Sequence, residues 1–103
     1  MVTLVGLMNH TATVNFFSQW TPSIQTAKGA NTLFYMGETG SVSCHGKDGV
    51  SNTMGAALWE LDYVLNGAVL GMDGVFFHMG TPFFYSMWQP VAYNGTAARV
   101  YPT

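Results

Sequence analysis

Two polar side chains, each at the end of a short apolar run, are the best placed residues for chemistry. Glu38 follows residues 33–37, and His78 ends the run of residues 74–78. In parallel α/β folds the carboxyl ends of neighbouring strands lie at one edge of the sheet, where catalytic groups are usually found. A carboxylate at the end of a buried strand needs partners or a catalytic function, because its desolvation is costly. We therefore predict that Glu38 is the functional centre.

His78 is expected beside Glu38, where it could form a hydrogen bond with the carboxylate or a ligand, or tune the protonation of Glu38. Structural interpretations stay open for both residues. Glu38 could cap a helix or pair with Lys28 or Lys47, and His78 could be a histidine satisfied within the core.

An aromatic run, residues 83–89, follows the second apolar segment. Because it follows a strand end, we expect it at the same edge as Glu38. Aromatic rings stack on sugars, while Tyr, Ser and Gln side chains bind hydroxyl and carboxylate groups. Tyr85 is therefore predicted to contact a ligand, although a packed loop is the alternative. Ser43, in the loop after Glu38, is a further candidate for substrate binding.

The elements that must position these residues follow from the hydrophobic pattern. A 3- to 4-residue period from about residue 11 to residue 28 predicts helix, which Pro22 divides in two, with Thr21 near the second cap. Residues 32–37 are predicted as a buried strand and residues 39–50 as a glycine-rich loop. The last 25 residues are predicted as a long loop with a final strand near residues 99–101.

The segment between the two predicted strands reads as one helix, residues 51–70, with Ser51 as its N-cap and Gly71 at its end. It carries a continuous apolar stripe at helical spacing, formed by Met54, Leu58, Leu61, Leu65 and Val69 and widened by Trp59 and Tyr63. The resulting order predicts an α/β fold with parallel strands joined by a crossover helix. Two such strands cannot form a stable sheet alone, so we predict a slice of a larger domain.

Composition excludes several classes of function. Charged residues make up 8% of the chain and the net charge is -2, so a partner that is nucleic acid or an anionic membrane is not expected. No transmembrane helix or signal peptide is apparent. The loop glycines lack the spacing of a phosphate-binding loop, and Cys44 with the three histidines lacks zinc-site spacing, so neither a cofactor nor a metal is predicted. Two glycosylation sequons, at Asn9 and Asn94, weakly favour secretion.

Several of these motifs together resemble glycoside hydrolase family 79, which contains β-glucuronidases and heparanase. The resemblance rests on residues 37–41, 46–53 and 56–63, and residues 7–10 look like the opening of the helix before the nucleophile strand. Residues 77–81 and 85–91 look like the fungal β-glucuronidase-type members. One departure is Gly40, which stands where the family has Asn after Gly-Glu-Thr.

The resemblance implies part of a (β/α)8 TIM barrel, comprising its last two strands and their helices, with residues 32–38 as strand seven and residues 74–78 as strand eight. Residues 1–103 would be a partial catalytic domain that reaches a following β region near residues 92–103. The resemblance also implies that Glu38 is the nucleophile of a retaining mechanism and that Tyr85 contacts the carboxylate of a uronate sugar.

The same mechanism needs a second carboxylic acid, which the resemblance places upstream of this chain. Of the other acidic residues, Glu60 and Asp62 lie on the crossover helix and Asp73 lies at the N-terminal end of its strand. Asp48 lies in the right loop but lacks the setting that the family gives this acid. We expect an extracellular full-length enzyme that acts on β-linked glucuronides, and little activity from these 103 residues alone. A heparanase-type enzyme acting on polysaccharides and a non-catalytic carbohydrate-binding remnant stay open as alternatives.

Overall fold

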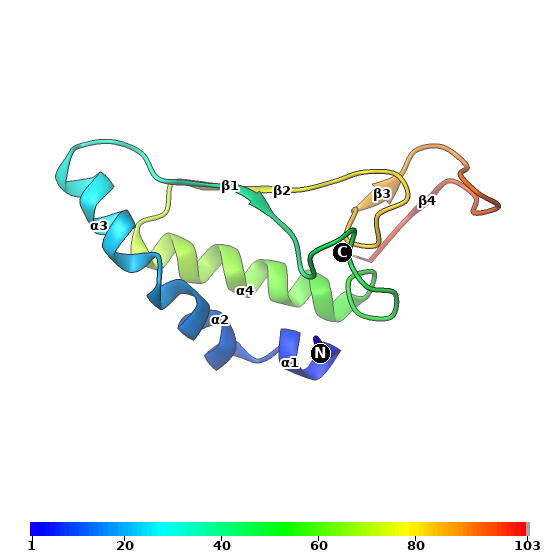
Figure 1. Ribbon diagram of the computed structural model, residues 1–103, viewed down its shortest axis with the longest axis horizontal. Helices are drawn as coiled ribbons and strands as arrows, with labels where there is room; N and C mark the ends of the chain where they lie inside the picture. The colour runs from blue at the N-terminus through cyan, green and yellow to red at the C-terminus, as the bar shows by residue number, and fades with distance from the viewer. Residues whose placement is uncertain (103) are drawn as a thin grey trace.

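Helices cover one face of a short parallel sheet in the computed structural model, which describes residues 1–102 (Figure 1). The strands β1 and β2 pair in parallel, and β3 and β4 form a separate antiparallel pair. The predicted mixture of helices and strands around a parallel pair is confirmed. Along the chain the elements are α1 (Leu4–Leu7), α2 (His10–Ser18), α3 (Thr21–Gly29), β1 (Tyr35–Thr39), α4 (Met54–Leu70), β2 (Gly74–Phe77), β3 (Trp88–Gln89) and β4 (Arg99–Val100).

The first helical region is divided where proline predicts it. The side chain of Asn9 accepts a hydrogen bond from the backbone N–H of Thr11 and caps α2. Pro22 lies in the first turn of α3, where a missing N–H leaves no helical hydrogen bond unmade. The N-cap of α3 is Trp20 rather than Thr21, and its side chain makes no capping bond.

The long helix α4 begins two residues later than predicted. Its N-cap is Thr53, whose hydroxyl accepts from the N–H of Ala56 at 3.4 Å. Ser51 is fully buried instead, and its hydroxyl accepts from the N–H of Lys47 at 2.9 Å. The predicted end of the helix is confirmed, since Gly71 adopts the left-handed conformation with φ of 96°.

The buried side of α4 consists of small and aromatic residues. Gly55, Ala56, Tyr63 and Gly67 are buried there, so the predicted burial of Tyr63, at the edge of the apolar stripe, is confirmed. The five residues that define the stripe are at least half exposed: Met54, Leu58, Leu61, Leu65 and Val69. Small residues allow close approach to the rings of the core. A helix that is apolar on most sides is typical of the interior of a larger protein.

Aromatic packing holds the helices to the sheet, and one carboxylate joins the two strands where they begin. The rings of Phe17 and Tyr63, on α2 and α4, lie 4.7 Å apart in a buried cluster with Met36 of β1. At the start of the strands, Asp73 accepts a hydrogen bond from the N–H of Phe34 at 2.8 Å. This bond joins the segments that enter β1 and β2 and helps to align the two strands.

The C-terminal region contains the predicted last strand and one strand that the sequence did not reveal. Arg99–Val100 pairs with Trp88–Gln89, which lies within the aromatic run. A two-residue strand has no periodicity of its own, so only its distant partner defines it. Within residues 1–102, no helix has the length and apolar character that crossing a membrane requires.

Replacing Thr53 tests the observed start of α4. Thr53→Ala is expected to lower the free energy of unfolding by about 1 kcal/mol, because the first turn loses its capping acceptor. Thr53→Asp keeps an acceptor and is expected to retain most of the stability. Chemical denaturation of the two variants checks this, and equal losses from both would argue against Thr53 as the cap.

Glu60 on α4 is expected to make stability depend on pH. Burial raises the pKa of Glu60 from 4.5 to about 7, so the folded state binds this proton more tightly than the unfolded state. The stabilising contribution of Glu60 to the folded state is therefore fully present below pH 4.5 and is lost as the pH rises through about 7. Because the side chain is partly exposed, we expect an effect on the order of 1 kcal/mol.

Unfolding measurements between pH 4 and pH 8 check this expectation. Glu60→Gln should flatten that part of the stability profile, whereas Asp48→Asn, which removes a carboxylate from a loop, serves as the control. If the stability of Glu60→Gln changed with pH as steeply as that of the unsubstituted protein, Glu60 would not be the source of the pH dependence.

Candidate active site

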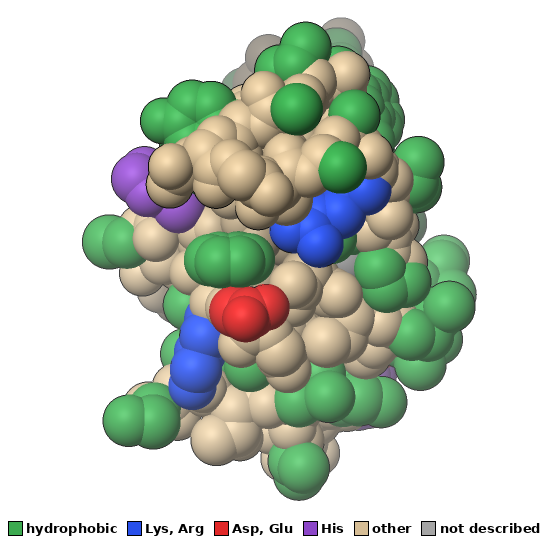
Figure 2. All heavy atoms as spheres, turned by 90° about the vertical axis from the view of Figure 1, so that its right-hand side faces the viewer, with side chains coloured by type: hydrophobic (Ala, Val, Ile, Leu, Met, Phe, Trp, Pro, Cys, Tyr) green, Lys and Arg blue, Asp and Glu red, His purple; other side chains and the backbone are tan. Residues whose placement is uncertain are grey.

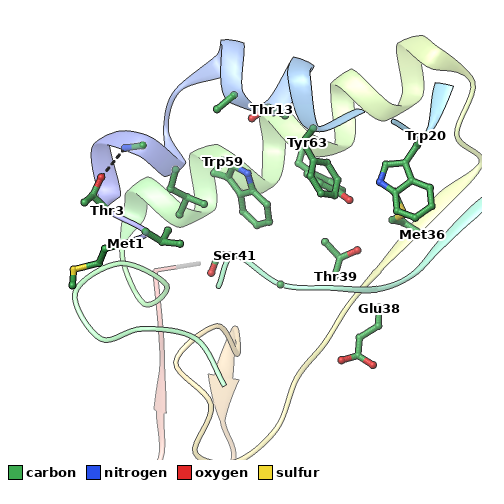
Figure 3. Close-up of a pocket in the computed structure, with 16 residues that line it drawn as sticks. Met1, Thr3, Thr13, Trp20, Met36, Glu38, Thr39, Ser41, Trp59 and Tyr63 are labelled. Carbon is green, nitrogen blue, oxygen red and sulfur yellow. Dashed lines mark hydrogen bonds between the residues drawn. The ribbon is translucent and has the colours of Figure 1, made fainter. Parts of the chain in front are cut away.

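An irregularity in β1 turns Glu38 away from the helices. Met36 is aligned with Val75 of β2, but the residue aligned with Phe77 is Thr39, so β1 contains one extra residue at this point. Met36 and Thr39 are consequently both buried on the helix side. Regular alternation would place Glu38 on the same side as Met36, whereas the bulge directs it to the opposite face. Figure 3 shows Thr39 and Glu38 on opposite sides of the strand.

The position of Glu38 differs from the prediction in two respects. The strand spans Tyr35–Thr39 rather than residues 32–37, so Glu38 lies within it. The predicted desolvation is wrong, since the side chain of Glu38 is 76% exposed. Nothing among residues 1–102 covers that face of the sheet over the carboxylate. The adjacent Gly37 was the available sequence signal for a bulge, because glycine within a strand often marks one.

All four predicted site residues line one pocket of about 290 Å³. Glu38 and His78 come from the ends of β1 and β2, Ser43 from the loop after β1, and Tyr85 from the segment after β2. The structure thus brings together side chains that are up to 47 residues apart in the sequence. Their roles in binding or catalysis remain predictions. The other lining residues are Thr39, Gly40, Val42 and Cys44.

Glu38 and His78 are neighbours without a direct hydrogen bond. Their nearest atoms, Oε1 and Nδ1, are 3.9 Å apart, which is an ion-pair distance but too long for a hydrogen bond. The backbone N–H of His78 donates to the carbonyl of Thr39 at 2.8 Å, and this bond keeps the two strand ends together.

The predicted alternative, in which a lysine pairs with Glu38, is wrong. Lys28 lies 3.6 Å from Asp73 at the other end of the sheet. The ammonium of Lys47 donates to the carbonyl of Val2 at 2.9 Å. Among the described residues, the neighbour of Glu38 that could pair with it is therefore His78, which forms an ion pair only when its imidazole is protonated.

Tyr85 forms a buried wall of the pocket. Its ring packs against Gly40, where an added Cβ would lie 3.2 Å from Cδ1 of the ring. Burial raises the pKa of Tyr85, and the neighbouring acidic groups of Glu38 and Cys44 raise it further. The phenol consequently stays protonated at neutral pH and can donate a hydrogen bond into the pocket.

Phe83 links the two histidines near this pocket. Its ring stacks on His45 at 4.1 Å between centroids and on His78 at 5.7 Å. Because His45 belongs to the loop after β1 and His78 to the end of β2, the stack holds the loop beside the strand ends. Neither the stack nor its geometry could be read from residue spacing.

The loop after β1 contains three consecutive residues in the left-handed region. The φ angles are 60° at Cys44, 74° at His45 and 83° at Gly46. This conformation costs roughly 1–2 kcal/mol for each non-glycine residue, so the surrounding contacts must impose it. One such contact is the hydrogen bond from the N–H of Phe84 to the carbonyl of His45, 2.8 Å long.

A second, larger pocket of about 510 Å³ lies mainly on the helix side of β1 (Figure 3). Its lining includes Leu7, Phe16, Trp59 and Tyr63, so it is predominantly apolar. Burial raises the pKa of Tyr63, and the nearby Thr39 side chain opposes this shift. We assign the candidate chemistry to the smaller pocket, since His78, Ser43 and Tyr85 line only that one.

Charged groups are sparse around the site. Residues 1–102 contain no cluster of three or more His, Cys, Asp or Glu side chains suited to a metal ion. The face in Figure 2 carries separate small patches of acidic and basic side chains among hydrophobic and neutral polar ones. A ligand of the Glu38 pocket would therefore be recognised by neutral hydrogen-bond donors and aromatic rings rather than by the electric field of clustered charges.

The chain is similar to part of two fungal glycoside hydrolases. Both are curated β-glucuronidases. The Neurospora crassa protein is 41% identical over 108 residues, covering 97% of this chain and 19% of that protein. The Aspergillus niger protein is 36% identical over 94 residues, covering 87% of this chain and 17% of that protein.

These matches support a β-glucuronidase-like segment, and the chain spans less than a fifth of the length of either relative, 19% and 17%. No family model matches the chain, and no solved structure matches it. The similarity to glycoside hydrolases therefore rests on the two fungal relatives.

Two glycines in the loop after β1 test how tightly it must pack on the segment after β2. Both have positive φ, but an added Cβ at Gly46 would lie 2.9 Å from the backbone N of Tyr85, whereas at Gly49 it would meet nothing within 4 Å. Gly49→Ala is expected to cost about 1 kcal/mol, the backbone strain alone. Gly46→Ala is expected to cost about 2–3 kcal/mol more, because backbone must also move. Thermal or chemical unfolding measures the difference, and equal costs would contradict this close packing.

Proposed function

We propose that this chain carries the nucleophile of a retaining glycoside hydrolase of family 79 that cleaves β-linked glucuronides. The observation that carries the proposal is the convergence of Glu38, His78 and Tyr85 on one pocket at the carboxyl ends of two parallel strands. Catalytic groups of parallel α/β enzymes typically lie at this edge. The similarity to the two β-glucuronidases supports the substrate class.

In the proposed mechanism, a carboxylate oxygen of Glu38 attacks the anomeric carbon and forms a covalent glycosyl-enzyme as the bond to the leaving oxygen breaks. A second carboxylic acid protonates that oxygen. It then acts as a base and removes a proton from the water that hydrolyses the intermediate. Retention of configuration requires the two carboxyl groups to be about 5–5.5 Å apart.

The second carboxylic acid must come from outside the described residues. Asp48, Glu60, Asp62 and Asp73 do not line the pocket of Glu38. Glu60 and Asp62 belong to α4, and Asp73 pairs with Lys28 just before β2. The fungal relatives are more than five times as long as the segment they share with this chain, which leaves room for such a residue in a longer protein.

The uncovered face of the sheet supports the proposal that β1 and β2 are the last two strands of a (β/α)8 barrel. Tyr35 and Phe76 are 49% and 60% exposed on this face, and their rings lie 5.9 Å apart. Parallel sheets are almost always covered on both faces. In a barrel this face would be the packed interior, and Glu38 would lie at its catalytic end.

Neutral donors in the pocket support an anionic sugar as the substrate. Tyr85 offers a protonated phenol, and among residues 1–102 no hydrogen bond uses the N–H groups of Ser43 or Cys44, which line the pocket. Successive N–H groups in such turns form concavities that bind anions. The pocket lacks Lys and Arg, which a sulfated polysaccharide would require, so this geometry favours a glucuronide over a heparanase-type substrate.

We also propose that the full-length protein is extracellular, consistent with its two glycosylation sequons. Asn9 uses its side-chain oxygen to cap α2. Asn94 is exposed in the turn before β4, with φ of 46°. Asn94 is therefore the better acceptor for a glycan.

A graft into a complete relative tests the proposed function. The 108-residue matching segment of the Neurospora crassa β-glucuronidase is replaced by this chain, and release of 4-nitrophenol from its β-glucuronide and β-glucoside is measured. The graft is expected to hydrolyse the glucuronide in preference to the glucoside. Glu38→Gln should lower kcat by at least about a thousandfold, because no nucleophile remains.

Asp48→Asn is the matched control, because it neutralises a carboxylate in the loop after β1 that does not line the pocket of Glu38. It should leave activity within about threefold, because it does not touch the reacting atoms. The 103-residue chain alone should show no turnover. A folded graft without activity, or one in which Glu38→Gln and Asp48→Asn are equally active, would sink the proposal.

A further inference from the structure

Gly40 occupies the strand end next to the candidate nucleophile and directly beneath the ring of Tyr85. We infer that Gly40 and Tyr85 act as one specificity-determining pair, in which the missing side chain at position 40 admits the Tyr85 ring to the pocket of Glu38. This inference deepens the proposed function and rests on it for the substrate class.

The backbone of Gly40 does not explain why this residue is glycine. Its φ lies outside the left-handed region, so any residue could adopt its conformation. The surrounding space is the constraint, because an added Cβ would lie 3.2 Å from Cδ1 and 3.3 Å from Cε1 of Tyr85. Most real Cβ atoms lie farther from their neighbours, so a side chain at position 40 would press on the ring.

The Tyr85 ring has little room to withdraw from such a side chain. His78 and Phe83 contact it edge to face, with centroids 5.9 Å and 5.7 Å away. Its backbone N is held close to the loop after β1, 2.9 Å from where a Cβ of Gly46 would lie. A side chain at position 40 would therefore rotate the ring within the pocket rather than shift the whole segment.

Rotation of this ring would change which sugars fit. Tyr85 supplies an apolar wall and a phenol whose pKa is raised by the charge of Glu38, so its place determines where a sugar ring and its C5 carboxylate can lie. The Gly40–Tyr85 pair is expected to act mainly on substrate binding and on the preference for a uronate over a neutral sugar. Tyr85 is the contacting residue, and Gly40 acts through it as a positioning residue.

A double-mutant cycle in the grafted enzyme tests the pair, with 4-nitrophenyl β-glucuronide and β-glucoside as substrates. Gly40→Ala is expected to lower kcat/KM for the glucuronide about tenfold or more, largely through KM, and to reduce the preference over the glucoside. In a Tyr85→Ala background the same change should have less than about a twofold effect, because the ring it displaces is absent. Gly29→Ala, at the end of α3, is the control, because an added Cβ there meets nothing within 4 Å and the residue does not line the pocket.

If Gly40→Ala changes kcat/KM equally with and without the Tyr85 ring, the inference that the two residues act as a pair is overturned. If the Gly40→Ala single variant does not fold, the inference requires that the double variant Gly40→Ala/Tyr85→Ala folds. If the double variant also fails to fold, the inference is overturned. If the folded graft has no glucuronidase activity at all, the proposed function fails, and the pair is judged by NMR of the tyrosine rings in that folded graft. There, Gly40→Ala should move the Tyr85 ring signals and Gly29→Ala should not, and unmoved Tyr85 signals in Gly40→Ala would overturn the inference.

Discussion

The extra residue in β1 is the constraint on which the candidate site depends. The helices bury Met36 and Thr39 together, in contact with the aromatic rings of α2 and α4. A regular strand could not present both residues to one face and also place Glu38 on the other. The bulge satisfies the core and directs the carboxylate to the uncovered face. Because bulges are frequent next to active sites, this geometry connects the packing of the core directly with the chemistry proposed for Glu38.

Contacts between the segments that follow the two strands then form the pocket. The stack of His45 on Phe83 and the hydrogen bond from Phe84 to His45 hold the loop after β1 in its left-handed conformation. The same contacts place Tyr85 over Gly40. Strain at Cys44 and His45 is therefore offset by packing that is specific to this site. Strained backbone held by its surroundings is a recurring feature of functional sites, since it fixes groups before a ligand arrives.

Local signals in the sequence were sufficient for most of the elements. Pro22 and Gly71 act through backbone conformation alone, so the division of the first helical region and the end of α4 could be predicted. The N-cap of α4 could not be assigned correctly, because Ser51 and Thr53 have equivalent chemistry and only the buried position of Ser51 excludes it. Periodicity also could not tell which side of α4 meets the sheet, since that helix is apolar on most sides. The bulge depends on pairing with β2, a long-range property that no local pattern contains.

The candidate residues were found because strand ends can be located without knowing the strand register. Their desolvation, in contrast, was predicted incorrectly, and the reason is physical. A carboxylate reacts as a nucleophile most effectively in a site that excludes water, where fixed dipoles replace its hydration shell. Glu38 is 76% exposed, and Tyr35 and Phe76 beside it are uncovered as well. The same covering structure would therefore bury the apolar face of the sheet and enclose the carboxylate. Folding of the barrel and activation of Glu38 are thus one physical event in the proposed enzyme, because each needs that face to be closed.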